Sequence, residues 1–132
     1  MVLGGAGDDR LLGEAGNDRI EGGDGDDIVL AGDGNDTVEA GAGADVVMAG
    51  AGDDRVAGGM GNDRLLGEAG DDCLDAGSGD DVVEGGAGDD EIHGGAGHDR
   101  LSGGAGRDEV HGGSGDDTVI VEADCADDIY AG

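Results

Sequence analysis

The segment Gly85-Gly86-Ala87-Gly88-Asp89-Asp90-Glu91-Ile92-His93 is one copy of the nine-residue repeat that decides the fold of this chain. Copies follow one another without a gap from Gly4 to Ile120, which makes thirteen units. The consensus is G-G-x-G-x-D-x-U-x, where U is aliphatic. Position four is Gly, position six is Asp and position eight is Leu, Ile or Val in every unit.

This period predicts an all-β fold, because a short extended segment followed by a glycine-rich reversal repeats throughout. We expect three extended residues and six turn residues per unit, with one inward side chain, the aliphatic residue at position eight. Two units, or 18 residues, then complete one coil of a right-handed parallel β-roll solenoid of about seven coils. Odd and even units form opposite sheets.

The whole chain, 1–132, is predicted to be a single domain of this kind. Residues 1–3 are a partial repeat, residues 4–120 are the thirteen strict units, and residues 121–132 are a slipped terminal repeat. In the slipped repeat Asp127, Ile129 and Tyr130 resume the pattern after one inserted residue.

The composition indicates a thin aliphatic core and a strong need for cations. The chain has 34 Gly, no Pro and one aromatic residue, and its 34 acidic residues against six Arg give a formal charge of −28. Six scattered arginines cannot form the basic face that nucleic acid requires. No apolar run is long enough to span a membrane. The sequence contains no catalytic motif of the protease, hydrolase or P-loop type, so we expect no enzyme activity.

The turn sequence Gly85-Gly86-Ala87-Gly88-Asp89-Asp90 and its copies resemble the glycine-rich repeats of the repeats-in-toxin (RTX) family, over about 90 percent of the chain. This resemblance implies calcium ions between turns two units apart, held by the position-six carboxylates and by turn carbonyls. It also implies a bacterial protein that is secreted or displayed at the cell surface, is exported unfolded and folds in extracellular calcium.

Physical chemistry agrees with a calcium site, because Ca²⁺ takes six to eight hard oxygen ligands and stacked glycine turns can aim carbonyls and carboxylates at one point. The expected carboxylates are Asp9, Asp18, Asp27, Asp36, Asp45, Asp54, Asp63, Asp72, Asp81, Asp90, Asp99, Asp108 and Asp117. The expected carbonyls lie near Gly7, Gly16, Gly25, Gly34, Gly43, Gly52, Gly61, Gly70, Gly79, Gly88, Gly97, Gly106 and Gly115. Pairing unit n with n+2 gives about 11 ions.

Some turns depart from the consensus, and we expect these to bind more weakly. Positions one and two are substituted at Ala31, Ala40, Ala49, Ala76, Glu14 and Glu68, and position five is Ala44, His98 or Arg107 in three units.

The outward positions of the odd units are unusually apolar, and we predict an interface at Leu12, Ile28, Leu30, Val46, Met48, Leu66 and Val82. A contiguous aliphatic patch of this kind suggests a partner surface. Besides a calcium-triggered structural module, two alternatives stay open. One is a subunit of a self-assembling extracellular filament or surface layer, associating through chain ends or this face. The other is an adhesin segment.

The outward positions of the even units form a polar ladder. Asp75, His93 and His111 share position nine, beside Glu91 and Glu109 at position seven. Imidazole and carboxylate groups together suit a transition metal, and an ordinary solvated face is the alternative. Cys73 and Cys125 are separated by about three coils, or ~14 Å, which is too far for an intramolecular disulfide. We expect free thiols, or else an intermolecular bridge.

Overall fold

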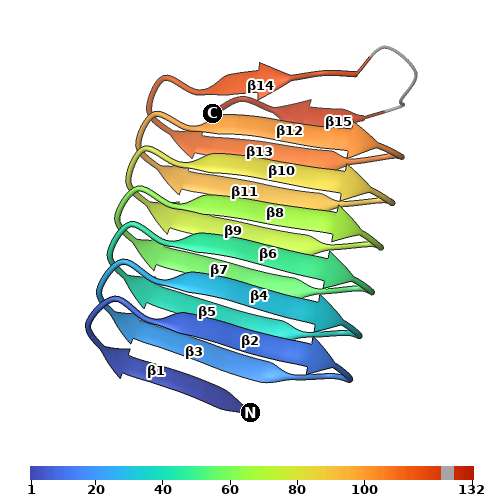
Figure 1. Cartoon of the computed structure of the whole chain (residues 1–132). Coiled ribbons are helices and arrows are strands. Elements are labelled where there is room, and N and C mark those ends of the chain that lie inside the picture. Colours follow the sequence, from blue (N-terminus) through green and yellow to red (C-terminus); the bar gives the residue numbers. More distant parts are fainter. Residues whose placement is uncertain (123–126) are drawn as a thin grey trace.

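The computed structural model of the chain describes residues 1–122 and 127–132, and it shows two parallel sheets wound into one solenoid (Figure 1). The eight-stranded sheet contains β1 (Val2–Ala6), β3 (Arg19–Asp24), β5 (Thr37–Ala42), β7 (Arg55–Met60), β9 (Cys73–Ser78), β11 (Glu91–Ala96), β13 (Glu109–Ser114) and β15 (Asp128–Tyr130). The seven-stranded sheet contains β2 (Arg10–Ala15), β4 (Ile28–Asp33), β6 (Val46–Ala51), β8 (Arg64–Ala69), β10 (Val82–Ala87), β12 (Arg100–Ala105) and β14 (Thr118–Ile120).

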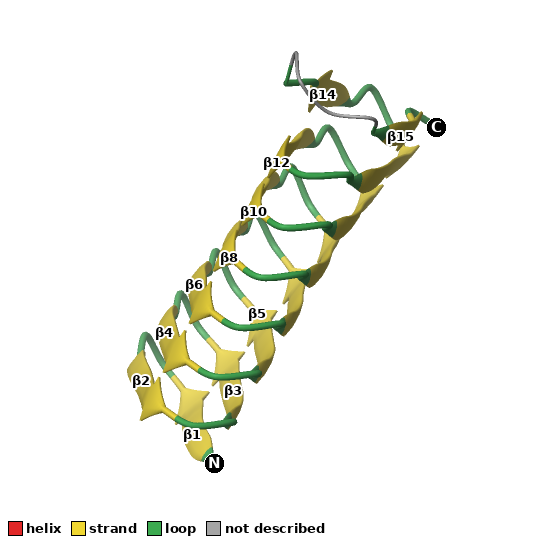
Figure 2. Cartoon of the chain, turned by 90° about the vertical axis from the view of Figure 1, so that its right-hand side faces the viewer, coloured by secondary structure: helices red, strands yellow, loops and turns green. Residues whose placement is uncertain are grey.

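The strand register confirms a coil of two units. Val29 of β4 pairs with Val47 of β6, which pairs with Leu65 of β8, so each step across the sheet is 18 residues. Positions seven to nine of the odd units lie in the seven-stranded sheet and those of the even units in the eight-stranded sheet, so alternate units contribute these strand residues to opposite sheets, as predicted. Figure 2 shows these sheets as opposite walls joined by a loop at every half coil. Within the described residues there is no helix, and hence none that could cross a membrane.

The division of each unit into strand and turn differs from the sequence-based expectation. Strand β10 continues from position seven of one unit to position three of the next, so most strands have six residues and most turns have three. The reason is that glycine-rich positions still pair with the neighbouring coil, as Gly86 does with Gly104 and Ala87 with Ala105. The prediction of three extended and six turn residues was therefore wrong.

The interior holds three inward positions per unit and not one. The position-eight residues from Ile20 to Val110 are all at most 2 percent exposed. Position one also faces inward, since Ala31, Ala40 and Ala49 are fully buried. Position six contributes buried aspartates to the same interior. Each half coil thus buries an aliphatic side chain, a small residue and a carboxylate.

Close stacking of the turns explains why position four is always glycine. Gly97 has a φ of 143°, which disfavours every other residue, and a Cβ atom there would lie 2.6 Å from the carbonyl carbon of Gly79 in the preceding coil. Position two also needs a positive φ, yet Glu14 and Glu68 adopt it, at 79° and 77°. Such left-handed residues cost roughly 1–2 kcal/mol each.

Both ends of the chain continue the repeat. Val2 of β1 pairs with Ile20 of β3. Ile129 of β15 pairs with Val110 of β13, so the slipped repeat resumes the ladder. Cys125, which was predicted to lie too far from Cys73 for a disulfide, is outside the described residues.

The apolar outer face of the seven-stranded sheet forms two columns along the solenoid. The strand register aligns Leu12, Leu30, Met48 and Leu66 in one column. The other column runs Arg10, Ile28, Val46, Arg64 and Val82. Leu12 and Ile28 are 52 and 42 percent exposed, and the other predicted interface residues are half-buried. The seven predicted residues therefore lie near one another on this face, with Arg10 and Arg64 among them, and their role as an interface stays a prediction.

Replacing Gly97 with Ala should lower the free energy of unfolding in saturating calcium by about 2–4 kcal/mol, because it adds backbone strain and a clash with rigid backbone. Gly7 is the matched control, since it holds the same position with a φ of 103° but has nothing within 4 Å of its Cβ direction. Gly7→Ala should cost only about 1–2 kcal/mol. Urea denaturation measures both, and equal losses would contradict the stacking argument.

Candidate metal centre

The position-six aspartates end the three-residue turns and direct their carboxylates into the solenoid. Those at most 3 percent exposed are Asp27, Asp36, Asp45, Asp54, Asp63, Asp72, Asp81, Asp90, Asp99 and Asp108. Asp9 and Asp18 in the first coil and Asp117 in the last strict unit are half-buried. The thirteen predicted carboxylates therefore form two rows that run along the solenoid, one inside each of the two lines of turns that connect the sheets.

One oxygen of each buried carboxylate is fixed by the preceding coil. Asp99 Oδ1 accepts a hydrogen bond from the backbone N–H of Asp81 at 2.9 Å, and Asp27 Oδ1 accepts one from Asp9 at 2.8 Å. In the slipped repeat, Asp127 makes the equivalent bond, and its Oδ1 accepts from the backbone N–H of Asp108 at 3.3 Å. This bond holds the side chain in one orientation across the gap between coils.

The second oxygen has no hydrogen-bond partner. Among the described residues, eleven such buried atoms occur, namely the Oδ2 atoms of Asp27, Asp36, Asp45, Asp54, Asp63, Asp72, Asp81, Asp90, Asp99, Asp108 and Asp117. A buried carboxylate oxygen without a partner is costly unless a cation or a proton meets it. The fold therefore presents eleven equivalent oxygens that need positive charge.

In the units whose position one is Gly, this oxygen lies beside that inward position. A Cβ atom built on Gly94 would lie 2.6 Å from Asp99 Oδ2 and 2.6 Å from the carbonyl oxygen of Gly112 in the next coil. The corresponding distances at Gly58 are 2.6 Å to Asp63 Oδ2 and 2.7 Å to the Ala76 carbonyl oxygen. A carboxylate and a carbonyl thus flank the space that glycine leaves open, and these hard oxygens fit calcium.

The sequence analysis did not consider the position-one carbonyl, and its expectation of carbonyl ligands near the position-four glycines stays a prediction. The position-four carbonyls lie close to the next turn, as the Gly7 oxygen does at 2.5 Å from a Cβ atom built on Gly25. No sequence signal marks a backbone oxygen, although the small residue at position one was visible. Where position one is Ala, a methyl group occupies this space, so weaker binding at Ala31, Ala40, Ala49 and Ala76 stays a prediction with a physical reason.

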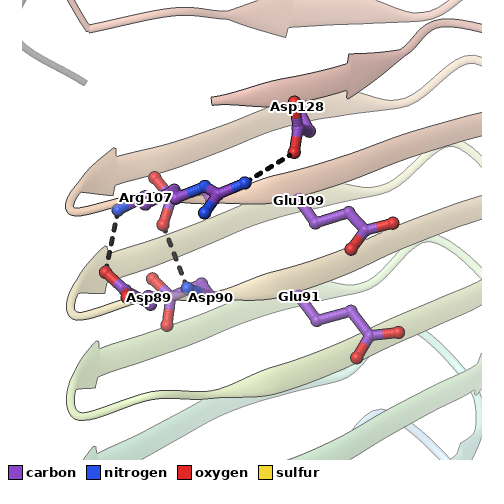
Figure 3. A pocket seen from close by; sticks show the side chains of 7 residues that line it. Asp89, Asp90, Glu91, Arg107, Glu109 and Asp128 are labelled. Carbon is purple, nitrogen blue, oxygen red and sulfur yellow. Dashed lines mark hydrogen bonds and ion pairs between the residues drawn. The ribbon is translucent and has the colours of Figure 1, made fainter. Parts of the chain in front are cut away.

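Position five supplies a second ladder that runs on the outside of the turns. Asp8 Oδ1 accepts from the backbone N–H of Asp26 at 3.0 Å, and Asp89 Oδ1 accepts from that of Arg107 at 2.9 Å (Figure 3). Position five is Asp or Asn in ten of thirteen units. This preference for a side-chain acceptor is the sequence feature from which the ladder could have been predicted. Ala44 has no side-chain acceptor, so this ladder is interrupted there.

One edge of the eight-stranded sheet has a surface pocket of about 280 Å³. It is lined by Asp89, Asp90, Glu91, Arg107, Asp108, Glu109 and Asp128 (Figure 3). The Arg107 guanidinium donates to Asp128 at 3.3 Å. Six carboxylates around one arginine make this pocket suitable for cations and unsuitable for anions.

Burial makes the inward carboxylates hard to ionise without a cation. It raises the pKa of Asp54 and Asp63 to about 6 and that of Asp90 to about 7. The backbone N–H bond from the preceding coil opposes this shift, and neighbouring carboxylates such as Asp72 reinforce it. Protons and metal ions therefore compete for the same oxygens.

Comparison with known proteins supports this chemistry. The family model described as RTX calcium-binding nonapeptide repeat (4 copies) matches residues 3–38, 30–65, 39–73, 49–83, 58–92, 66–101 and 84–119. These overlapping matches together extend over residues 3–119. A search of curated proteins gives no match.

Asp90→Asn should weaken the calcium-loaded fold by about 1–3 kcal/mol, because it keeps the Oδ1 acceptor but removes the charge and the free oxygen. Asp89→Asn is the matched control, since it removes one charge from the same turn at an exposed position. Its Oδ1 bond to Arg107 is retained. We expect Asp89→Asn to change the calcium midpoint of folding little, and equal effects of the two variants would contradict an inward site.

Lowering the pH should favour folding of the calcium-depleted chain. The folded-state pKa values of Asp54, Asp63 and Asp90 lie above the ordinary 3.8, so the folded chain binds more protons between that value and about 6–7. Stability without calcium should therefore be lost as the pH rises through this window. Far-ultraviolet circular dichroism at pH 5 and pH 8 measures this, above the isoelectric point near 4.1. More β signal at pH 8 would contradict it.

Proposed function

Because the chain belongs to the family of RTX calcium-binding nonapeptide repeats, we propose that it is a structural β-roll that folds when it binds extracellular calcium. The observation that carries this proposal is the set of eleven buried carboxylate oxygens that lack a partner. A structure that buries so many charges in a thin aliphatic interior is stable only when those charges are neutralised.

The residues expected to hold calcium are the position-six aspartates together with position-one carbonyls of the next coil. Asp99 and the Gly112 carbonyl are one such combination, and Asp63 and the Ala76 carbonyl are another. Bound calcium would supply the positive charge that these oxygens lack. We propose about 11 calcium ions per chain, one for each of the eleven carboxylate oxygens without a partner.

Without a cation, the charges of the chain oppose the fold in two ways. The net charge of −28 favours an expanded chain. Within the solenoid, Asp72, Asp90 and Asp108 of successive coils follow one another along one row, and the charges of Asp72 and Asp108 add to the burial that raises the pKa of Asp90. The aliphatic residues at position eight alone provide little apolar burial to offset this. Folding and calcium binding are thus coupled.

This coupling explains how location could control structure. Calcium is scarce in cytosol and abundant outside cells, so the chain would stay open before export and become a rigid solenoid afterwards. The family resemblance favours a bacterial secreted or cell-surface protein, and the high negative charge is consistent with delayed folding. No catalytic group is needed for such a role.

Titration of the chelated chain with calcium should produce a cooperative gain of β signal in far-ultraviolet circular dichroism. Magnesium at the same concentration is the control, and it should produce little change, because Mg²⁺ demands octahedral geometry and gives up its water reluctantly. The proposal fails if the chelated chain at neutral pH already shows the full β signal.

A further inference from the structure

The outer face of the eight-stranded sheet carries the same tripeptide pattern, Glu-x-His, on two neighbouring strands. Glu91-Ile92-His93 lies in β11 and Glu109-Val110-His111 lies in β13. The strands pair in register, with Glu91 opposite Glu109 and His93 opposite His111. Because side chains alternate along a strand, Glu and His share the outer face while Ile92 and Val110 are buried in the core.

Within each strand, the glutamate and histidine already contact each other. His93 Nε2 lies 2.9 Å from Glu91 Oε1, and His111 Nε2 lies 2.8 Å from Glu109 Oε1. The two imidazole rings stack with centroids 4.8 Å apart and planes at 7°. The ring of Tyr130 stacks on the far side of His111 at 4.6 Å and 6°, which supports that ring's orientation.

These contacts place two nitrogen and two oxygen donors at the corners of a quadrilateral. Two of its sides are the His–Glu contacts, and these two pairs lie on neighbouring strands whose imidazole rings stack with centroids 4.8 Å apart. We propose that Glu91, His93, Glu109 and His111 bind one divalent transition-metal ion, of the kind that accepts imidazole and carboxylate together, such as Zn²⁺ or Cu²⁺.

A small movement closes the site. In the described part of the chain, no three His, Cys, Asp or Glu side chains already surround one point. Two nitrogens bound to one ion at about 2.0–2.1 Å each must lie about 3–4 Å apart. The ring centroids are 4.8 Å apart, so each ring has to move toward the other by less than about 1 Å. The side chains of His93 and His111 are 40 and 32 percent exposed, which leaves room for this tilt.

The electrostatic surroundings favour a cation at this place. Glu91 and Glu109 place two carboxylates side by side on this face. Asp75 is in register with His93 on β9 and adds a further carboxylate beside the site. The site is separate from the inward calcium positions, since it lies on the opposite side of the same strands.

Calcium and the transition-metal ions prefer different ligand atoms. Calcium prefers oxygen ligands only, whereas imidazole selects zinc, copper and nickel. An excess of calcium should therefore occupy the inward sites without blocking the Glu-x-His site. We expect one Zn²⁺ per chain to bind in millimolar calcium.

Isothermal titration calorimetry with Zn²⁺, in several millimolar calcium, tests this on the whole chain. Loss of a ligand should weaken binding about 10- to 100-fold in His93→Asn and in His111→Asn. His98→Asn is the matched control, because His98 is the third histidine of the chain and lies in a turn. An Asn at position 98 can still accept from the backbone N–H of Asp116, as His98 Nδ1 does at 3.0 Å. This variant should bind as the unchanged chain does.

The double variant Glu91→Gln, Glu109→Gln tests the carboxylates, and a similar weakening is expected. Far-ultraviolet circular dichroism in calcium should show every variant folded, so the result is independent of the proposed calcium function. Absence of zinc binding in calcium would overturn the proposal. Binding that survives both histidine substitutions, or that depends on His98, would also overturn it.

Discussion

Burial of one carboxylate in every nine-residue unit is the constraint on which this structure depends. The position-six side chain is directed inward and accepts a backbone N–H from the preceding coil with one oxygen, while the other oxygen has no protein partner. That arrangement leaves little space at position one, because a Cβ atom there would lie close to the carboxylate oxygen in many units. Position one is therefore always one of the two smallest residues, glycine or alanine. In the proposed calcium-bound state the ions would then be part of the core, because the aliphatic residues alone cannot compensate for rows of buried charge.

The sequence predicted the architecture well because the strict residues are those with a single structural role. Asp at six, Gly at four and an aliphatic residue at eight recur in every unit, and an 18-residue coil with alternate units in opposite sheets follows from that period. Strand length was misjudged because Gly86 and its equivalents pair through backbone groups, which leave no side-chain signature. The position-one carbonyls beside the aspartates could not be anticipated for the same reason, whereas the regular spacing of the aspartates was visible, and their inward direction is what the structure adds.

The outward positions are free of these constraints, and the two faces have diverged. The side chains at positions seven and nine lie on the outer face, away from the interior that holds the buried aliphatic residues. One face aligns Leu12, Leu30 and Met48, and the other aligns His93 with His111. Any property placed at one outward position is brought within about 4.8 Å of its equivalent in the next coil. A solenoid of this kind therefore turns a pair of similar repeats into a pair of adjacent side chains.

Assignment of odd and even units to opposite sheets restricts how such a chain can change its length. Gain or loss of 18 residues adds or removes a whole coil and leaves every remaining side chain on its own face. Gain or loss of nine residues would transfer all later outward residues to the other face, and would place Glu91 and His93 among the leucines. The segment from Arg10 to Gly16 recurs as Arg64 to Gly70, 54 residues later, which is three whole coils. Its strands β2 and β8 lie on the same sheet, as a separation of whole coils requires.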